Sequence, residues 1–361
     1  MKKIAFVIEH LYGGGAERVT AALINELCAK AGCEIHLIVY SQDPQHNFPT
    51  DSRIIWHEVH CMQGGKLNRI LSRVKLLRET VRKISPDCVV SLGSPLIVAP
   101  LSAAMLGLRI PLVLSERNDP KRFPENRWHR ILRMLYYTQC DGLVFQTKQA
   151  RDYFPAFMIR KSSVICNPIT GKLPPRHEGK REKRIVNFCR LVPQKNLSLL
   201  IHAFSDIAGI FPEHILQIYG NGPLRQQLAE QIASLGLEDR VFLCGQSDHI
   251  YDDIRTAALF VSSSDYEGIS NSMLEALALG VPTVCTDCPA GGAGEMIRNG
   301  ENGLLVPVAD RAALAGAMTQ VLKDEALAEK MSLAGTQLRQ TLCVGEIAKE
   351  WLAVIDRVIA G

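Results

Sequence analysis

The segment Asp265–Ala278 reads DYEGISNSMLEALA and joins a glycine turn to the start of an amphipathic helix. Directly before it, Ala257–Ser264 (AALFVSSS) is apolar and then ends in small polar residues, which is typical of a buried strand leaving its sheet. A strand, a turn and a helix N-terminus together form an anion site. The first backbone N–H groups of a helix lack partners within it, and the helix dipole is positive there.

Two glutamates, Glu267 and Glu275, lie eight positions apart on this segment. Carboxylates only accept hydrogen bonds, so they suit the hydroxyl groups of a ligand. An anion site beside two such acceptors favours a nucleotide sugar as the ligand. A structural alternative stays open, because Ser272 and Glu275 have the spacing of a capping box, in which Glu275 would only satisfy the helix end.

Length and composition favour a soluble globular protein with two domains. The chain has 361 residues, of which 47% are hydrophobic and 22% charged. The uncharged run Cys88–Leu108 is long enough to cross a bilayer, but its prolines and glycines favour a buried strand followed by a buried helix. The apolar N-terminus is interrupted by Glu9 and His10, so we do not expect a signal peptide.

The cysteine pattern favours a reduced, cytosolic compartment. The eleven cysteines are odd in number and scattered, and most lie in apolar runs. Cys285 and Cys288 form a C-x-x-C pair, but no second pair or suitably spaced histidine accompanies them. We therefore predict no metal site.

Charge and composition divide the chain in two. Residues 1–170 hold 23 Lys and Arg against 14 Asp and Glu, a net charge of +9, so the whole-chain charge of +4 leaves −5 for the remainder. A basic first half suggests that it meets an anionic surface or substrate. Strand and helix patterns alternate in both halves. We predict a first domain over 1–170, a linker over 171–183, a second domain over 184–343 and a terminal helix over 344–361.

A second glycine turn, Gly13–Gly15, follows the strand predicted at Lys3–Glu9 and precedes a helix. Glycine lets the backbone approach a ligand closely. A dinucleotide fingerprint is excluded because Arg18 occupies its third glycine position and no acidic residue ends the next strand, Glu34–Tyr40. A plain strand–helix turn remains the structural alternative.

A basic amphipathic helix is predicted at Lys66–Lys83. Such a helix is either simply solvated or lies on an anionic membrane. Its apolar residues are Leu67, Ile70, Leu71, Val74, Leu77 and Val81, and its cations are Lys66, Arg69, Arg73, Lys75, Arg78, Arg82 and Lys83.

The Glu-x7-Glu spacing of Glu267 and Glu275 resembles the signature of the retaining family 4 glycosyltransferases. Four more motifs of this family occur in the expected order, although the second begins with cysteine where the family usually has glycine. They are Gly13–Arg18 (GGGAER), Cys189–Asn196 (CRLVPQKN), Tyr219–Pro223 (YGNGP) and Gly300–Val306 (GENGLLV). The resemblance implies the GT-B fold, with two Rossmann-like doubly wound domains facing a cleft and a C-terminal helix crossing back to the first domain.

By this resemblance, Arg190 and Lys195 hold the diphosphate of a UDP-sugar donor, and Glu267 accepts hydrogen bonds from the sugar hydroxyls. No D-x-D triplet occurs, so we expect catalysis without a metal ion, the diphosphate being neutralised by these cations and a helix N-terminus. The other residues expected at the donor are Gly14, Gly15, Gly245, Gln246, Gly268, Ile269, Ser270, Asn271 and Glu275.

Related enzymes often place a histidine after the strand that here ends in SERNDP. Arg117 and Asn118 stand at that position, and Arg117 is a candidate for contact with a donor or acceptor phosphate. His129 is expected at the surface. Arg122, with Lys66, Arg69 and Arg73, is a candidate for contact with the acceptor or the membrane.

The function implied is retaining transfer of a hexose or N-acetylhexosamine, with GalNAc as first candidate, to a polyprenyl-diphosphate glycan. The chain resembles bacterial N-acetylgalactosaminyltransferases that act on lipid-linked oligosaccharides, so a peripheral position on the cytoplasmic membrane face is expected. The alternatives are a capsule or O-antigen glycosyltransferase with another donor, a UDP-sugar epimerase of the same fold, and a non-catalytic binding protein. Nucleic-acid binding is not expected, because the basic residues come without interleaved aromatics.

Overall fold

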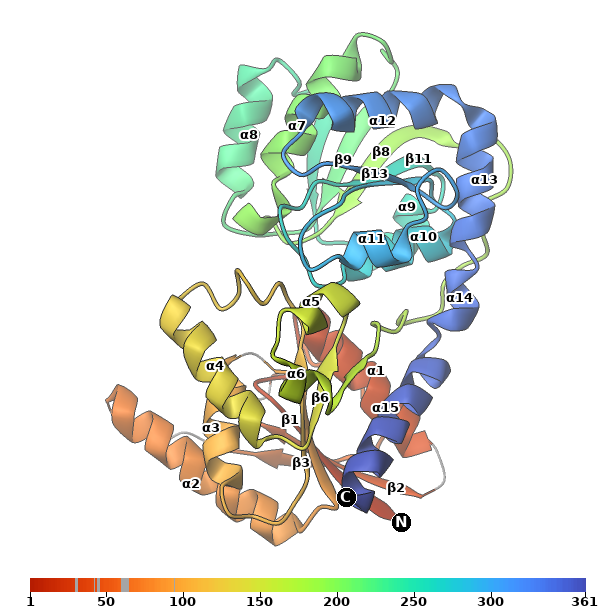
Figure 1. Cartoon of the computed structure of the whole chain (residues 1–361). Helices are drawn as coiled ribbons and strands as arrows, with labels where there is room; N and C mark the ends of the chain where they lie inside the picture. Colours follow the sequence, from red (N-terminus) through yellow and green to blue (C-terminus); the bar gives the residue numbers. More distant parts are fainter. Residues whose placement is uncertain (30–31, 42, 44–45, 60–64, 94) are drawn as a thin grey trace. The chain divides into compact units, whose positions relative to one another are not determined.

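A computed structural model describes residues 1–29, 32–41, 43, 46–59, 65–93 and 95–361 (Figure 1). The chain forms two units: Met1–Thr170 together with Leu342–Gly361, and Gly171–Thr341. The segment expected to be a linker is counted with the second unit. Arg181 ties it there by donating hydrogen bonds to the carbonyl oxygens of Ala257 (3.0 Å) and Gly280 (2.5 Å).

The first unit is built on a parallel sheet in the order β3-β2-β1-β4-β5-β6-β7. Its central strands are buried over most of their length because helices cover both faces. The strands are β1 Lys2–Ile8, β2 Cys33–Val39, β3 Ile55–Glu58, β4 Cys88–Ser91, β5 Leu112–Glu116, β6 Gly142–Phe145 and β7 Ser162–Val164.

Helices cover the two faces of this sheet in separate groups (Figure 1). Apolar residues of α2 (Lys66–Ile84), α3 (Pro95–Met105), α4 (Arg127–Gln139), α6 (Ala156–Ile159) and the turn after α5 (Lys148–Asp152) share one core with the strands. The uncharged run therefore forms β4 and α3, as predicted. Within the described residues, no helix combines the length and apolar character needed to span a membrane.

The last helix of the chain, α15 (Val344–Ala360), packs with α1 (Gly15–Ala29) and against β4, β5 and β6. Trp351 is fully buried there, and Lys2 pairs with Asp356 at 2.6 Å. A Cβ at Gly142 would lie 3.1 Å from a methyl carbon of Val358, so glycine lets the helix lie close to β6. The prediction that the terminal helix returns to the first domain is confirmed.

The second unit is built on a parallel sheet in the order β10-β9-β8-β11-β12-β13. Two parallel α/β units confirm the predicted fold class. The strands are β8 Glu182–Phe188, β9 Ile215–Tyr219, β10 Val241–Gly245, β11 Ala257–Ser262, β12 Thr283–Thr286 and β13 Leu304–Val306.

The helices of the second unit form two layers. Three of them, α7 (Leu197–Ala208), α8 (Arg225–Ser234) and α12 (Arg311–Lys323), share a core on one face of the sheet, while α10 (Asn271–Leu279) and α11 (Gly292–Met296) lie on the other (Figure 1). The remaining elements are η1 Pro193–Lys195, α9 Ile250–Ile254, α13 Glu325–Gly335 and α14 Leu338–Thr341.

Strand order reverses at the β1/β4 pair of the first sheet and at the β8/β11 pair of the second. Loops that follow such a pair at the carboxyl edge diverge to opposite faces and leave room for a ligand. The loops after β8 and β11 are those that carry Arg190, Lys195 and Glu267.

Candidate active site

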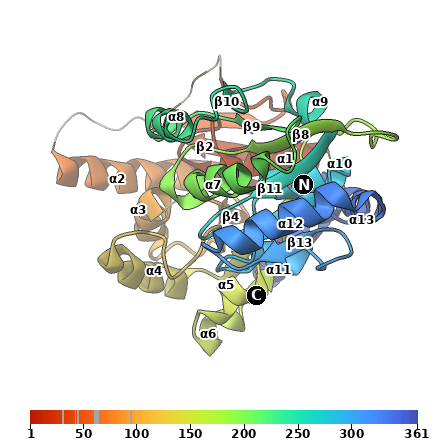
Figure 2. The same ribbon diagram turned by 90° about the horizontal axis from the view of Figure 1, so that it is seen from above.

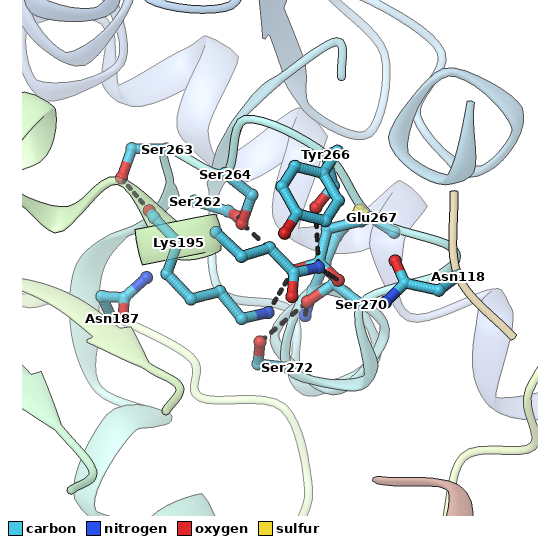
Figure 3. Close-up of polar contacts among 12 residues, drawn as sticks. Asn118, Asn187, Lys195, Ser262, Ser263, Ser264, Tyr266, Glu267, Ser270 and Ser272 are labelled. Atoms are coloured by element: carbon cyan, nitrogen blue, oxygen red, sulfur yellow. Dashed lines mark hydrogen bonds and ion pairs between the residues drawn. The ribbon is translucent and has the colours of Figure 1, made fainter. Parts of the chain in front are cut away.

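The loops that follow β8 and β11 are joined by side-chain hydrogen bonds (Figure 3). Asn196 donates to the carboxylate of Asp265 at 2.7 Å, and Gln194 donates to the carbonyl oxygen of Tyr266 at 2.8 Å. Ser263 donates to the carbonyl oxygen of Asn196 at 3.0 Å. The two loops of the strand-order reversal therefore act as one structural piece.

An ion pair between Lys195 and Glu267 lies within this piece (Figure 3). Both side chains are 13% exposed. Ser264 donates to Oε1 of Glu267 at 3.1 Å, and Gln194 donates to Oε2 at 3.3 Å. Burial by itself lowers the pKa of Lys195, but the charge and hydrogen bond of Glu267, together with the nearby Cys189, raise it, and the net shift of the pKa is upward. Lys195 is therefore a fixed cation at neutral pH.

Gly268 leads from this pair to α10, whose N-cap is Ser270. The Ser270 side chain accepts a hydrogen bond from the N–H of Met273 at 3.4 Å. The capping-box alternative is wrong, since Ser272 already lies inside the helix. Glu275 is buried, with 2% of its surface exposed. The N–H groups of the first turn have no acceptor within the helix, so the positive end of α10 lies next to the ion pair.

The loop after β12 packs closely against the Gly268 turn. A Cβ at Gly292 would lie 1.9 Å from the carbonyl oxygen of Gly268, so only glycine permits this contact. The N–H of Glu267 also donates to the carbonyl oxygen of Pro289 at 3.3 Å. The glycine-rich segment PAGGAG is thus part of the scaffold of the site.

The two cysteines of the C-x-x-C pair are buried near this loop. Burial raises the pKa of Cys285, and it raises that of Cys288 to about 12. Both are therefore neutral thiols at physiological pH. Across the described ranges, no three His, Cys, Asp or Glu side chains are grouped to hold a metal ion.

Arg190 and the glycines after β9 and β10 extend the site along the carboxyl edge of the sheet. Arg190 is exposed, and within the part of the chain that the structure describes it forms no ion pair. Gly220 has φ +127°, and a Cβ there would lie 1.9 Å from the carbonyl oxygen of Cys189. Its N–H donates to the carbonyl oxygen of Gly245 at 2.6 Å. Gly245 is thus joined to the Arg190 loop through backbone contacts, with Gln246 exposed beside it.

A cavity of about 160 Å³ lies in the first unit, at the ends of β4 and β5 and the start of α1. Arg117 and Ser115 line it, and each has a buried polar atom (Nη1 and Oγ) that finds no hydrogen-bond partner among the described residues. The other terminal nitrogen of Arg117 donates to Asn167, which also accepts from Gln146 at 2.6 Å. Burial lowers the pKa of Arg117 to about 10, so its guanidinium is still charged at neutral pH.

A buried polar cluster holds the loop that carries Arg117. Glu116, at the end of β5, accepts hydrogen bonds from Arg133 (2.8 Å) and Tyr137 (3.1 Å) of α4. Arg133 also donates to the carbonyl oxygens of Pro120 and Phe123, both at 2.7 Å. Burial raises the pKa of Glu116 even though Arg133 opposes the shift. Arg133 therefore has a structural role, because it holds this loop against α4.

The glycine turn after β1 lies beside the same cavity. Gly13 has φ +75°, and Gly15 is the first residue of α1. Ala16 lines the cavity, as does Glu17, whose carboxylate packs closely over Gly14. Gly14 and Gly15 thus lie next to the cavity of Arg117.

The residues predicted to meet the acceptor or the membrane lie on α2 and before α4. Arg69 is exposed, and Arg73 lies partly buried over the ring of Tyr40, 4.7 Å from its centre. Arg122 is exposed at 4.0 Å from Asp119. The side chain of Lys66 lies outside the described part of the structure. His129 is exposed, as predicted.

Sequence reasoning did not single out Ser264, Gln194 or Ser115. Ser264 and Ser115 lie at or just beyond the end of a strand, and Gln194 lies in η1. Ser264 and Gln194 hold Glu267. The only signal available was the run of serines that ends the strand before Glu267. A run of this kind does not identify which hydroxyl points to which carboxylate.

Two family models match the chain and together cover almost all of it. Residues 13–170 match the model described as Glycosyltransferase Family 4. Residues 173–338 match the model described as Glycosyl transferases group 1. The boundary between the two matches coincides with the boundary between the two units at Thr170 and Gly171.

Curated relatives are similar over nearly their whole length. A Campylobacter jejuni N-acetylgalactosamine-N,N'-diacetylbacillosaminyl-diphospho-undecaprenol 4-alpha-N-acetylgalactosaminyltransferase is 30% identical, covering 91% of this chain and 92% of the relative. A second transferase of that organism, an alpha-1,4-N-acetyl-D-galactosaminyltransferase named for a diNAcBac-PP-undecaprenol substrate, is 26% identical over 99% of both. The lipopolysaccharide core biosynthesis glycosyltransferase LpsE of Rhizobium meliloti is 31% identical over 93% of both.

Solved structures share the fold at low sequence identity. Sucrose-phosphate synthase from Thermosynechococcus elongatus superposes with a TM-score of 0.85 at 19% identity, over 100% of both chains. Anabaena HepE in complex with UDP and glucose superposes with a TM-score of 0.81 at 18% identity, covering 99% of this chain and 100% of HepE.

Proposed function

Because the chain belongs to the family 4 glycosyltransferases, retaining enzymes of GT-B fold, we propose that it transfers an N-acetylhexosamine from a UDP-sugar to a polyprenyl-diphosphate-linked glycan. Glycosyl transfer follows from the family, and the donor and acceptor are the proposal. GalNAc is the first candidate because two full-length relatives are named as GalNAc transferases of undecaprenol-linked substrates. The observation that carries the proposal is the Lys195–Glu267 pair beside the N-terminus of α10.

In the proposed donor complex, the diphosphate lies between two cations and a helix end. Arg190 offers a planar pair of donors and Lys195 a compact charge. The N–H groups of Gly268–Asn271 (Gly268, Ile269, Ser270 and Asn271) and the dipole of α10 add positive electrostatic potential at the same place. Negative charge grows on the diphosphate as the sugar departs, and fixed donors in a protected site stabilise that charge without reorganising. These groups supply the neutralisation that a metal ion would otherwise provide.

The carboxylates and glycines take the neutral parts of the donor. Glu267 keeps acceptor capacity beyond its bonds to Lys195, Ser264 and Gln194, because a carboxylate has about four lone-pair directions. We assign it to the sugar hydroxyls. Glu275 would accept from the ribose. The base lies along the backbone of Gly245 and Gln246, and Gly14 and Gly15 contact the donor phosphate.

The first unit is the proposed acceptor side. The Arg117 cavity, with its unpartnered guanidinium nitrogen and serine hydroxyl, suits a phosphate or sugar oxygen of the bound substrates. On α2, Ile70 and Leu71 are 51% and 57% exposed near Arg69, which is the composition of a helix lying on an anionic surface. With Lys66, Arg73 and Arg122, this helix would meet lipid phosphates at the cytoplasmic face of a bacterial membrane.

A second candidate function is transfer to lipopolysaccharide or capsule from another donor. The observation in its favour is the 31% identity to LpsE, a lipopolysaccharide core enzyme. The same site residues would serve it, because they contact the diphosphate and hydroxyls that nucleotide sugars share. Donor and acceptor therefore have to be separated by experiment.

The test is a transfer assay with a panel of UDP- and GDP-sugars, bacterial lipid extract and EDTA. We expect radiolabel from UDP-GalNAc to enter the lipid fraction, and we expect EDTA not to prevent it. The Glu267→Ala variant serves as the negative control. Label entering lipid only from a different sugar nucleotide would replace the donor, and label entering only a soluble glycan would overturn the lipid-linked acceptor.

A further inference from the structure

The helix α4 carries its apolar residues on the solvent side. Trp128, Ile131, Leu132 and Leu135 are 63%, 50%, 40% and 56% exposed. Their spacing places them on one face of the helix. The opposite face is buried through Arg133, which is only 2% exposed. In an ordinary surface helix the apolar face is buried and the charged face is exposed, so α4 is inverted.

The inversion is fixed by hydrogen bonds. Arg133 is held by Glu116 at 2.8 Å and by two loop carbonyl oxygens, and Tyr137 donates to the same carboxylate at 3.1 Å. The helix start is fixed too, because the Asn126 side chain accepts from the N–H of Trp128 at 2.8 Å. Rotation of α4 to bury its apolar face would break this buried polar cluster, which is costly.

A shallow groove of about 530 Å³ continues the apolar face of α4 toward the turn between α5 and α6. Tyr153, which lines this groove, is 40% exposed, and Phe157 of α6 is 46% exposed. Contiguous exposed apolar surface of this kind marks an interaction site. The groove is lined by Arg127, Arg130, Ile131, Met134, Tyr153, Phe154 and Pro155.

Positive charge surrounds this apolar face. The helix contains no Asp or Glu, and Arg127 lies over the Trp128 ring at 5.3 Å from its centre. Lys121 and Arg122 are exposed on the preceding loop. The nearby exposed carboxylates are Glu125 and Asp152, and the second of these is paired with Arg151 at 2.8 Å. Complementarity therefore favours an anionic partner with an apolar interior.

We propose that α4 and the α5–α6 turn form a docking surface for an anionic lipid bilayer, with α4 lying in the plane of the interface. Tryptophan and arginine at the edge of an apolar face suit the headgroup region, where an apolar body and a polar tip are both satisfied. The helix α2 lies on the other side of α3 and also exposes Ile70 and Leu71 (Figures 1 and 2). The biological role of this docking surface rests on the proposed lipid-linked acceptor. The exposed apolar and basic residues that form the surface do not depend on that proposal.

The second unit provides a matched control. Its exposed large apolar residues include Ile210 and Leu333, at 53% and 52%, which lie on separate elements. We compare the full-length Trp128→Ala/Leu135→Ala variant with an Ile210→Ala/Leu333→Ala variant. Both remove two exposed side chains of the chain, so neither should lower Tm appreciably.

The measurement is co-sedimentation with phosphatidylglycerol–phosphatidylcholine vesicles and with pure phosphatidylcholine vesicles. Wild type and the second-unit variant should bind the anionic vesicles, whereas the α4 variant should bind on the order of tenfold or more weakly. Transfer to a water-soluble, short-prenyl acceptor should be equal in all three proteins. That readout separates failure of docking from failure of the proposed function.

Two results would overturn the proposal. Equal vesicle binding by the α4 variant and wild type would show that this face does not touch lipid. Self-association detected by light scattering without vesicles, and abolished in the α4 variant, would instead assign the face to a second copy of the chain. A blue shift of the Trp128 emission on adding anionic vesicles, measured as the difference between wild type and Trp128→Phe, would support docking.

Discussion

Lys195 and Glu267 form a pair whose members depend on each other. Each side chain is 13% exposed, so both are largely removed from water. Such a pair contributes little net stability, but removing one member strands the other in a poorly solvated place. Arg190 differs, because it is exposed and pairs with no carboxylate among the described residues. Removal of Lys195 should therefore destabilise the protein more than removal of Arg190, although both cations are proposed for the same diphosphate.

This difference gives a prediction for the two cations. Lys195→Met should lower the free energy of unfolding by about 1–3 kcal/mol, because Glu267 loses its counterion. Arg190→Met should leave stability within about 0.5 kcal/mol, as at an ordinary exposed site. Both should lower kcat/KM by roughly a hundredfold, as loss of a charge-stabilising donor does. Chemical denaturation and transfer kinetics measure the two effects.

An Arg190 variant that loses as much stability as the Lys195 variant would show that Arg190 is structural. A Lys195 variant with normal kcat/KM would remove it from the diphosphate site. Glu267→Gln is the comparison variant, since it keeps the shape of the side chain while removing its charge and one of its two acceptor oxygens.

Arg117 has the signature of a residue kept for function at the expense of stability. Burial lowers its pKa to about 10, and one terminal nitrogen is buried without a partner within the described chain. We predict that Arg117→Met leaves Tm unchanged or raises it, while transfer falls at least tenfold. Asn167 keeps its bond from Gln146 in this variant. Differential scanning fluorimetry and the transfer assay provide the two readouts, and a clear drop in Tm would contradict the assignment.

Most strands and helices were predictable from the sequence, because strands of a parallel sheet are buried on both faces and therefore appear as continuous apolar runs. Their boundaries were displaced by a residue or more, as at the strand predicted over Lys3–Glu9, which spans Lys2–Ile8. The orientation of α4 could not be predicted. The spacing of its apolar residues alone would bury the face that carries Trp128 and Ile131, whereas the structure buries Arg133, which donates to Glu116.

The residues of the donor site followed from motifs, but their mutual contacts did not. Nothing in the spacing of Lys195 and Glu267, 72 positions apart, states that they form an ion pair. That contact depends on β8 and β11 being neighbours, which is a property of sheet order. The helix cap at Ser270 also required coordinates, because Ser272 fits the sequence pattern equally well.

The glycine loop after β12 is predicted to control activity through the Gly268 turn. Gly292→Ala places a Cβ where the carbonyl oxygen of Gly268 lies, at 1.9 Å, so the turn has to move. We expect kcat/KM to fall tenfold or more, since small misplacements at a reacting centre have large effects. Gly316→Ala is the control, because that helical position has open space around it and alanine favours helix.

In the Gly316 variant, stability should be unchanged or rise by up to about 1 kcal/mol, with normal kcat/KM. Normal activity in the Gly292 variant would show that the Gly268 turn tolerates displacement, and it would separate this loop from the proposed site. Thermal unfolding of both proteins shows whether the Gly292 effect is local.

The two units differ in whether a single continuous segment of the chain forms them. The second unit is one uninterrupted segment, Gly171–Thr341, whereas the first needs both ends of the chain. The returning helix α15 supplies Trp351, which is fully buried, and Asp356, which pairs with Lys2 at 2.6 Å. A first unit without α15 would expose the apolar surface that this helix covers on β4, β5 and β6.

This continuity predicts that Gly171–Thr341 folds alone and binds UDP, whereas Met1–Thr170 alone does not fold stably. Apart from the Gly14–Gly15 turn and the candidate Arg117, every residue assigned to the nucleotide diphosphate lies in the second unit, so UDP affinity should fall by no more than about tenfold in the fragment. Calorimetric titration measures it, with the fragment carrying Lys195→Met as control. A folded fragment that does not bind UDP would place the nucleotide on the first unit and reverse the roles proposed for the two units.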